Sequence, residues 1–276
     1  MKRRQLITLA GLTAVGTAAS SLPFTSQAEI HWKPDGAGLL ARIGVLTPTL
    51  DPVPESEMWA MAPPGVSIHG SPVVWNGGPR AFADPPYVDD ATERLVRLAP
   101  RAILYAFTAS SYVLGAAADN SLRDRLEKRS GGIPVILTCD AATEALRLLE
   151  AHRVALIHPR WFPEQANAEA IDYFRAQGFE VPVCARMTPA GPFTEVPPAE
   201  LYKWVTTNVP RQADAVFIGG NGLRAVGAIQ ALEQSLGKPV LTANQVLLWR
   251  ALRLVGTTSM PTQYGRVFTQ IKESRS

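Results

Sequence analysis

Three hydroxyl residues, Thr108, Ser110 and Ser111, stand together directly after an apolar run. Hydroxyls and free backbone N–H groups at the end of a strand are suited to binding a carboxylate. The same residue types also cap helices, which is the competing interpretation. We expect these three side chains to hold the carboxylate of a small substrate.

A glycine-rich turn, Gly219-Gly220-Asn221-Gly222, follows a second apolar run and precedes Arg224. Its backbone N–H groups are able to form an anion nest at a helix N-terminus. Gly220, Asn221 and Gly222 are therefore predicted to contact substrate. The turn is not GxGxxG and lacks the Lys-Ser/Thr of a phosphate loop, which argues against a nucleotide. A tight turn that needs positive φ is the competing interpretation.

Acid–base candidates occur at three places. Asp51 follows the apolar run at 42–48, and its carboxylate is a candidate general base, whereas Glu55 and Glu57 are interpreted as solvated loop charges. His158 and Tyr112 are the next candidates for proton transfer, although a satisfied buried histidine is the commoner case.

Several further side chains have open roles. Trp161 is predicted to contact substrate as a wall of the cleft, with ordinary packing as the competing interpretation. Cys139 lies where a helix N-terminus would lower its pKa. Cys184 is interpreted as a buried strand cysteine. Whether the two cysteines form a disulfide is left open. The four histidines show no metal-ligand spacing, so no metal site is predicted.

The composition is that of a globular protein, with 276 residues, 46% hydrophobic and 18% charged. The chain has 27 basic and 24 acidic residues, but Lys2, Arg3 and Arg4 lie in a 28-residue start that holds no acid. Without that start the charges balance, so no basic patch indicates a nucleic-acid partner.

The first 28 residues are typical of an export signal. A basic start is followed by an uncharged, moderately apolar stretch, and Arg3-Arg4-Gln-Leu-Ile resembles a twin-arginine motif. We expect residues 1–28 to be removed and the protein to be periplasmic, with no membrane association afterwards. A retained anchor and a cytosolic N-terminus are the alternatives.

Apolar runs alternate with helical periodicity, which predicts a parallel α/β fold. The expected strands are 42–48, 66–74, 102–107, 133–137, 153–158, 179–184, 213–218 and 239–242. The expected helices are 89–98, 141–149, 167–177 and 223–236, with a closing helix at 246–249. Residues 75–86 and 188–198 are expected to be long loops.

An internal duplication is visible in the sequence. RIGVLTP at 42 matches RVALIHP at 153, and AILYAF at 102 matches AVFIGG at 215. The nearly constant spacing predicts two similar lobes, 29–138 and 139–245, with 246–276 returning to the first lobe. In such sheets ligands lie beyond the carboxyl ends of the strands, which predicts a site between the lobes.

With these segments the chain resembles the aspartate/glutamate racemase superfamily, in its maleate cis–trans isomerase and arylmalonate decarboxylase branch. YAFTASSYVLG, IPVILTCDAATEAL, AVFIGGNGLRAVGAIQALE and GKPVLTANQVLLW carry the resemblance. It implies two pseudosymmetric flavodoxin-like lobes that hold a small carboxylic acid between them, with chemistry that needs no cofactor. Two-base members use one cysteine from each lobe, and the decarboxylase branch uses one from the second lobe.

Both thiol positions of that family are changed in this chain. The family reads YACTSGS where this chain has Phe107 at the thiol position, and SCTNLR where it has Gly220. Neither residue donates a proton or attacks carbon. The family asparagine after the first strand aligns with Asp51.

We therefore expect a cofactor-independent isomerase, racemase or decarboxylase. Its substrate would be a small carboxylic or dicarboxylic acid that reacts through an enolate-like intermediate with a non-cysteine acid or base. An exported carboxylate-binding protein without catalysis is the main alternative, because both nucleophiles are missing. A nucleotide- or flavin-binding protein is a third interpretation that rests on the fold alone. Homo-oligomerisation is left open.

Overall fold

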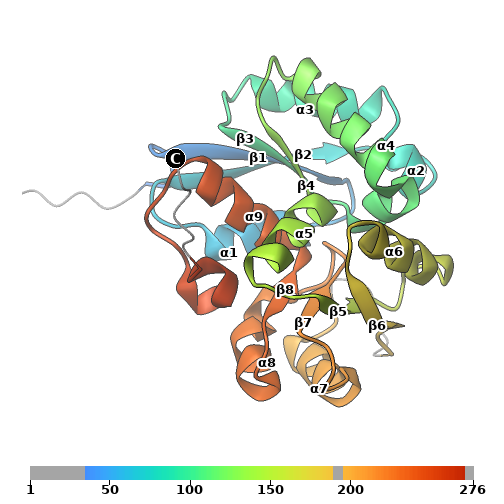
Figure 1. The fold of residues 1–276 in the computed structure, drawn as a ribbon. Helices are drawn as coiled ribbons and strands as arrows, with labels where there is room; N and C mark the ends of the chain where they lie inside the picture. Colours follow the sequence, from blue (N-terminus) through green and yellow to red (C-terminus); the bar gives the residue numbers. More distant parts are fainter. Residues whose placement is uncertain (1–34, 189–194, 271–276) are drawn as a thin grey trace, which may run out of the picture. The chain divides into compact units, whose positions relative to one another are not determined.

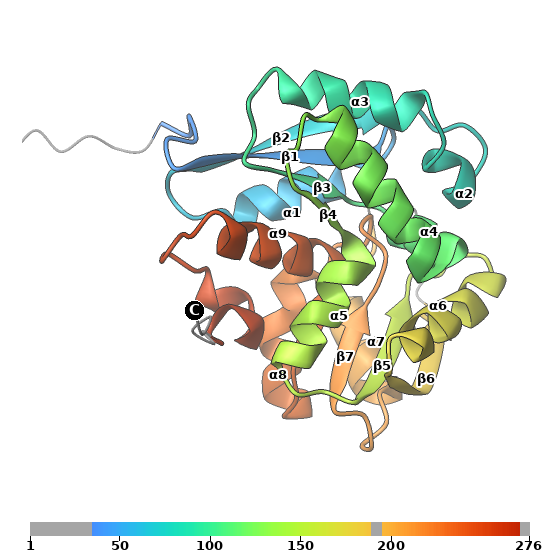
Figure 2. The ribbon, with the colours of Figure 1, turned by 45° about the horizontal axis from the view of Figure 1, so that its top comes forward.

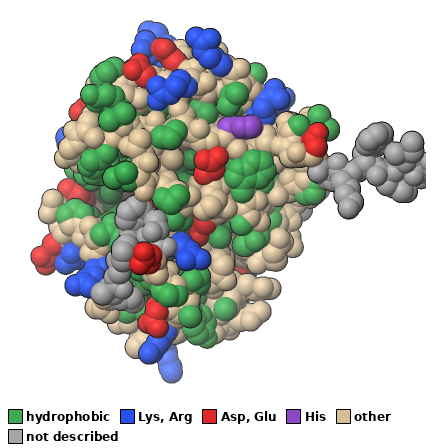
Figure 3. Space-filling view, turned by 180° about the vertical axis from the view of Figure 1, so that it is seen from behind, with side chains coloured by type: hydrophobic (Ala, Val, Ile, Leu, Met, Phe, Trp, Pro, Cys, Tyr) green, Lys and Arg blue, Asp and Glu red, His purple; other side chains and the backbone are tan. Residues whose placement is uncertain are grey.

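The computed structural model describes residues 35–188 and 195–270 (Figure 1). The expected export signal at 1–28 and most of the expected loop at 188–198 lie outside these residues. Among the helices of the described residues, none has the length and apolarity needed to cross a membrane. On the face shown in Figure 3, basic and acidic side chains are interspersed.

Two four-stranded parallel sheets form the framework, and they share one strand order. The first sheet has the order β2-β1-β3-β4, with β1 (Ala41–Pro48), β2 (Val66–Val73), β3 (Ala102–Tyr105) and β4 (Val135–Leu137). The second has the order β6-β5-β7-β8, with β5 (Arg153–His158), β6 (Glu180–Arg186), β7 (Ala215–Ile218) and β8 (Val240–Thr242). This α/β architecture with two equivalent sheets confirms the predicted fold class.

The inner strands β3 and β7 are continuous apolar runs, as expected where helices cover both faces of a parallel sheet. Every residue of β3 and β7 is buried. The edge strand β6 is only partly covered, so Cys184 is half-buried and not the buried strand cysteine that was expected.

Nine α-helices and three 3₁₀ turns are assigned in the described residues. They are α1 (Val53–Met61), α2 (Pro79–Phe82), α3 (Tyr87–Val96), α4 (Thr108–Arg129), α5 (Thr138–Leu148), α6 (Gln165–Ala176), α7 (Pro198–Asn208), α8 (Ile229–Leu236), α9 (Ala243–Leu254), η1 (Val226–Ala228), η2 (Thr262–Tyr264) and η3 (Arg266–Phe268).

Two expectations about local structure are wrong. The helix expected from residue 223 begins only at Ile229, because residues 219–225 form a turn in which Leu223 N donates to Gly220 O. The glycine-rich turn is therefore not at a helix N-terminus. The expected loop at 75–86 contains the short helix α2, which has Pro79 at its first position.

The two lobes exchange helices. Helix α5 follows the first sheet, yet its Arg147 donates to Gln177 and lies over the Phe179 ring in the second lobe. Helix α9 follows the second sheet and packs against α1, β3 and β4 of the first. Figure 2 shows α5 beside the strands of the second sheet, and α9 beside α1.

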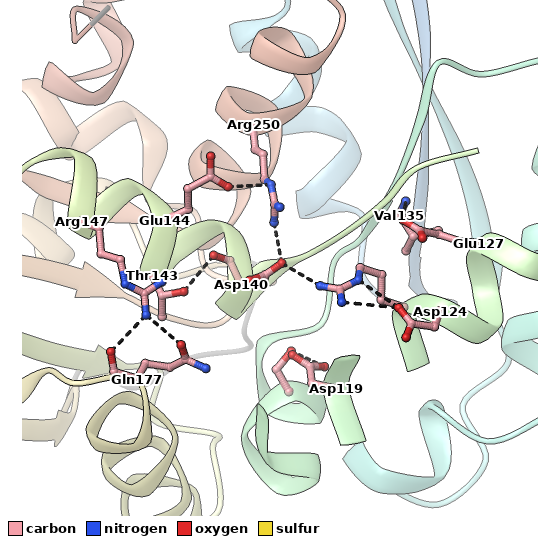
Figure 4. A network of polar contacts seen from close by, with 12 residues as sticks. Asp119, Asp124, Glu127, Val135, Asp140, Thr143, Glu144, Arg147, Gln177 and Arg250 are labelled. Atoms are coloured by element: carbon pink, nitrogen blue, oxygen red, sulfur yellow. Dashed lines mark hydrogen bonds and ion pairs between the residues drawn. The ribbon is translucent and has the colours of Figure 1, made fainter. Parts of the chain in front are cut away.

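A polar network joins the exchanged helices (Figure 4). Asp140 of α5 accepts from Arg250 of α9 at 2.6 Å and from Arg123 of α4 at 3.3 Å. Arg250 also pairs with Glu144 at 2.8 Å. These side chains are partly exposed, so each pair stabilises the packing by about 0.2–1 kcal/mol.

Candidate active site

A cavity of about 350 Å³ lies where the carboxyl ends of both sheets meet. This is the expected place for a ligand in open parallel sheets. The segments after β1, β3, β5 and β7 supply most of its lining. The lining residues are Pro48, Leu50, Asp51, Trp75, Pro79, Phe107, Ala109, Trp161, Phe162, Pro163, Gly220, Asn221 and Gly222.

The walls of this cavity are mainly apolar and aromatic. The Phe107 ring packs at 4.5 Å from Phe82 and at 5.6 Å from Trp75, measured between ring centroids. Trp161 lies in the wall, in the place that the sequence predicted for a substrate contact, and it stays 38% exposed. Such a cavity favours a ligand that has an apolar part beside its polar group.

Asp51 is the ionisable side chain in the lining of this cavity, within the described ranges. It follows β1, and its Oδ1 accepts from the backbone N–H of Val53 at 3.1 Å. Burial raises the pKa of Asp51 to about 6, against the weaker opposing effect of that hydrogen bond. A carboxyl with this pKa is suited to give or take a proton near neutral pH.

The turn at 219–222 has no room for side chains at its first two positions. Gly220 has φ of +95°, and a Cβ there would lie 2.8 Å from the Pro159 ring. A Cβ on Gly219 would lie 2.9 Å from the Tyr112 hydroxyl. The structure shows the tight turn of the competing interpretation, and this turn also lines the cavity, whereas its contact with substrate stays a prediction.

Backbone donors of this turn face no protein acceptor. Within residues 35–188 and 195–270, no acceptor pairs with the backbone N–H of Asn221 or Gly222, and both residues line the cavity. Unpaired N–H groups at a glycine-rich turn are the donors that an anionic oxygen needs.

The three hydroxyl residues lie behind the cavity wall. Thr108 Oγ1 donates to Asn221 Oδ1 at 2.7 Å and accepts from Gly220 N at 3.2 Å. Tyr105 donates its hydroxyl to Ser110 Oγ at 2.7 Å, and Ser111 Oγ donates to Asp119 at 3.0 Å. In this structure these side chains position the wall, and the cavity lining does not include them.

His158 and Tyr112 form a buried pair beside the cavity. The Tyr112 hydroxyl lies 3.1 Å from His158 Nε2, and His158 Nδ1 lies 2.9 Å from Asn167 Oδ1. Burial lowers the pKa of His158 to about 4 and raises the pKa of Tyr112. Both groups are therefore neutral at pH 7, and neither lines the cavity.

The expectation for the thiols needs correction. Cys139 lies in the first turn of α5, yet its pKa is raised because the thiol is fully buried, and burial outweighs any effect of the helix terminus. Burial likewise raises the pKa of Cys184 to about 12. Both thiols are free, so the two cysteines do not form a disulfide in this structure.

Sequence reasoning missed the group that supports the turn. Glu57 was interpreted as a solvated loop charge, but it is 8% exposed on α1 and accepts from the backbone N–H groups of Ala225 and Val226. Asn244, at the start of α9, donates to Glu57 and to Asn221. The position of Asn244 directly after a strand was the available signal, whereas no sequence pattern distinguished Glu57.

Comparison with known proteins identifies the family of this chain. The arylmalonate decarboxylase family matches residues 86–268 of this chain. The chain belongs to the arylmalonate decarboxylase family. The arylmalonate decarboxylase of Bordetella bronchiseptica is 26% identical over 189 residues, which cover 66% of this chain and 77% of that protein.

Solved structures with the same fold include both enzyme types of that branch. Unliganded arylmalonate decarboxylase aligns with a TM-score of 0.72 and 23% identity, over 84% of this chain and 100% of that chain. The maleate isomerase Iso of Pseudomonas putida S16 aligns with a TM-score of 0.74 and 20% identity. The Nocardia farcinica maleate cis–trans isomerase bound to TRIS aligns with a TM-score of 0.74 and 23% identity. Each alignment covers 83% of this chain and 98% of the other chain. The predicted relationship to enzymes of the isomerase or lyase type is confirmed.

Proposed function

We propose that this protein is a cofactor-independent carbon–carbon lyase that decarboxylates a small dicarboxylic acid carrying an apolar substituent. Asp51 takes the role of proton donor that a cysteine has in the related branch. The observation that carries this proposal is the place of Asp51 in an otherwise apolar cavity, together with the free N–H groups of Asn221 and Gly222. Membership of the arylmalonate decarboxylase family supports it.

The cavity suits a substrate that loses a charge. No Lys or Arg side chain is in its lining among the described residues, so a carboxylate that enters the apolar part is poorly solvated. The second carboxylate accepts hydrogen bonds from the unpaired backbone N–H groups of Asn221 and Gly222. The apolar substituent packs against aromatic walls such as Phe107 and Trp161.

The proposed reaction has two steps. The bond between the α-carbon and the poorly solvated carboxylate breaks, CO₂ leaves, and the bonding electron pair forms an enediolate on the remaining carboxylate. Backbone N–H groups stabilise the charge on its oxygens. Protonated Asp51 then gives its proton to the α-carbon, and water reprotonates Asp51. The substrate anion itself favours the protonated form of Asp51.

Decarboxylation is favoured over the other two reactions by the number of groups it needs. Racemisation through an enolate uses an acid and a base on opposite faces of the carbon, and isomerisation by addition needs a nucleophile. Phe107 and Gly220 occupy the positions that align with the family thiols, and neither supplies such a group. Decarboxylation needs one proton donor, and Asp51 is available.

The test is turnover of a panel of acids in D₂O, followed by proton NMR. The panel contains alkyl- and aryl-substituted malonates, maleate and α-substituted monocarboxylates. We expect a monocarboxylate with one deuterium at the α-carbon from a substituted malonate. Asp51→Asn is expected to lower kcat by about 10²-fold or more, whereas Glu55→Gln, a matched change on α1 away from the cavity, leaves it unchanged. Binding without product would contradict the proposal and support the carboxylate-binding alternative.

We also propose that the protein is exported by a twin-arginine route, which rests on Arg3 and Arg4 alone. Changing both residues to lysine is expected to leave the protein in the cytoplasmic fraction. Unchanged export would contradict the route.

A further inference from the structure

The carboxylate of Glu57 is bonded on both oxygens inside the fold. Its Oε1 accepts from Ala225 N at 2.7 Å and from Val226 N at 3.0 Å. Its Oε2 accepts from Asn244 Nδ2 at 2.8 Å. One side chain on α1 therefore holds the end of the turn that lines the cavity and also the first residues of α9. Figure 2 shows α1 and α9 side by side.

Asn244 also forms hydrogen bonds with Asn221, which lines the cavity, and so links Glu57 to the cavity wall. Asn244 Nδ2 donates to Asn221 O at 2.8 Å, and Asn244 Oδ1 accepts from Asn221 Nδ2 at 2.9 Å. Asn221 Oδ1 in turn accepts from Thr108 N and Thr108 Oγ1. The chain of bonds from Glu57 to Thr108 fixes the orientation of both amide groups, since every polar atom in it has a partner.

We propose that Glu57 is a positioning residue, whose ionised carboxylate holds residues 220–226 and the amide of Asn221 in the geometry that binds the substrate anion. This inference rests on the proposed function. Glu57 is not in the lining of the cavity and acts through the turn and through Asn244.

Both oxygens of Glu57 face N–H donors, so the network is fully bonded only when the carboxylate is ionised. A proton on Oε2, or the amide nitrogen of a glutamine there, would face the Asn244 amide with donor against donor. Asn244 cannot turn over to relieve this, because its oxygen already accepts from Asn221 and its nitrogen already donates to Asn221. Loss of the charge therefore breaks the link to the cavity wall.

The surroundings of Glu57 allow its carboxylate to gain or lose a proton near neutral pH. Burial raises the pKa of Glu57 to about 7, against the hydrogen bonds from Asn244, Val226 and Ala225, and the charge of Asp51 acts in the same direction as burial. Helix α9 presents the neutral Asn244, and the turn presents Arg224. A second hollow of about 430 Å³, lined by Glu57 and Arg224, gives solvent protons a path.

The first test needs no substrate. Hydrogen exchange of the peptide that covers residues 219–228 is measured for the wild type, Glu57→Gln and the control Glu55→Gln, between about pH 6 and pH 8.5. We expect the wild type to exchange this peptide more slowly as pH rises, after correction for the intrinsic rate. Glu57→Gln is expected to show the fast exchange of the acidic wild type at every pH, and Glu55→Gln to follow the wild type.

The second test uses turnover of the acid found in the panel. Glu57→Gln is expected to raise KM by about tenfold and to remove the rise of kcat/KM around pH 7, while the alkaline fall due to Asp51 remains. The direction in which KM changes separates two roles of the Glu57 charge, which either holds the turn in place or repels the substrate anion. Removing a nearby negative charge without disturbing the turn would lower KM for an anion, so a lower KM would overturn the proposal.

Asn244→Ala keeps the test decisive if Glu57→Gln does not fold. It removes a hydrogen bond that lowers the pKa of Glu57, so the rise of kcat/KM is expected to move to higher pH, with a higher KM. Unchanged exchange of residues 219–228 in both variants would overturn the inference. Absence of turnover with every acid would overturn the proposed function alone, because the exchange result would still decide the role of Glu57.

Discussion

Thr108 and Asn221, which are 113 residues apart, are joined by two hydrogen bonds to one oxygen. Asn221 Oδ1 accepts from Thr108 N at 2.8 Å and from Thr108 Oγ1 at 2.7 Å. The two residues follow equivalent strands, β3 and β7, of the two lobes. The cavity wall is therefore closed by a contact between the lobes, and each lobe alone would lack it.

Replacing Thr108 tests this contact. Thr108→Val keeps the shape and the backbone bond but leaves Asn221 Oδ1 and Gly220 N with fewer partners. We expect a loss of about 1–3 kcal/mol in the free energy of unfolding and lower turnover, both measured in parallel by urea unfolding and NMR. Thr108→Ser retains the hydroxyl and is expected to stay near the wild type. A Thr108→Val variant as stable and active as the wild type would contradict a role for the hydroxyl, and equal losses in both variants would show that the methyl group matters as much as the hydroxyl.

Placing a cysteine at Phe107 or Gly220, the two positions predicted to align with the family thiols, is expected to have unequal results. Gly220→Cys introduces a Cβ 2.8 Å from the Pro159 ring at a φ of +95°, so it should lower stability by about 1–3 kcal/mol. Phe107→Cys meets no such backbone strain, since φ is −150° there, and places a thiol in the cavity. Thermal melting and labelling of the native protein by iodoacetamide measure both effects. A stable, readily labelled Gly220→Cys variant would contradict the steric argument.

The native cysteines are expected to be dispensable. Burial raises the pKa of both Cys139 and Cys184, so their thiolate populations at neutral pH are small. Cys184→Ser should retain the turnover of the wild type, and the wild type should resist inactivation by iodoacetamide at about pH 7.5. Rapid inactivation that the Cys184→Ser change prevents would assign a role to this thiol.

The pH dependence of stability is expected to carry the signature of Glu57. Its pKa is about 7 in the fold against an ordinary 4.5, so the folded state binds the proton more tightly than the unfolded state. The fold as a whole is therefore most stable with Glu57 protonated, below about pH 4.5, and this stabilisation is lost as pH rises through about 7, a change on the order of 3 kcal/mol. Burying the charge costs more free energy than its hydrogen bonds return, although those bonds order the turn.

The comparison with Glu57→Gln isolates this contribution. The free energy of unfolding of the wild type minus that of the variant should fall between about pH 5 and pH 8, measured by urea unfolding. The lowered pKa of His158, about 4, acts in the opposite direction as pH falls from 6.5, but it is common to both proteins and cancels. A difference that stays constant with pH would show that Glu57 does not titrate with a raised pKa.

The sequence by itself determined the two-lobe α/β framework. Parallel strands covered on both faces are continuous apolar runs, so all eight could be predicted from local pattern, with ends that differ from the observed ones by at most two residues. The repeated segments at 42 and 153 indicated the duplication, and the residues after the strands indicated Asp51 and the turn at 220–222 as parts of one site.

Only the tertiary structure decided which side chains face the cavity and which support it. Thr108 and Glu57 are both polar, yet both are buried, because each finds its hydrogen-bond partner far along the chain. Asn221 lies 113 residues from Thr108, and Asn244 lies 187 residues from Glu57. The same is true of Cys139, whose pKa follows from burial between elements and not from its place at a helix start. Local pattern reports the periodicity of one element, whereas burial and hydrogen-bond partners are set by how distant elements pack together.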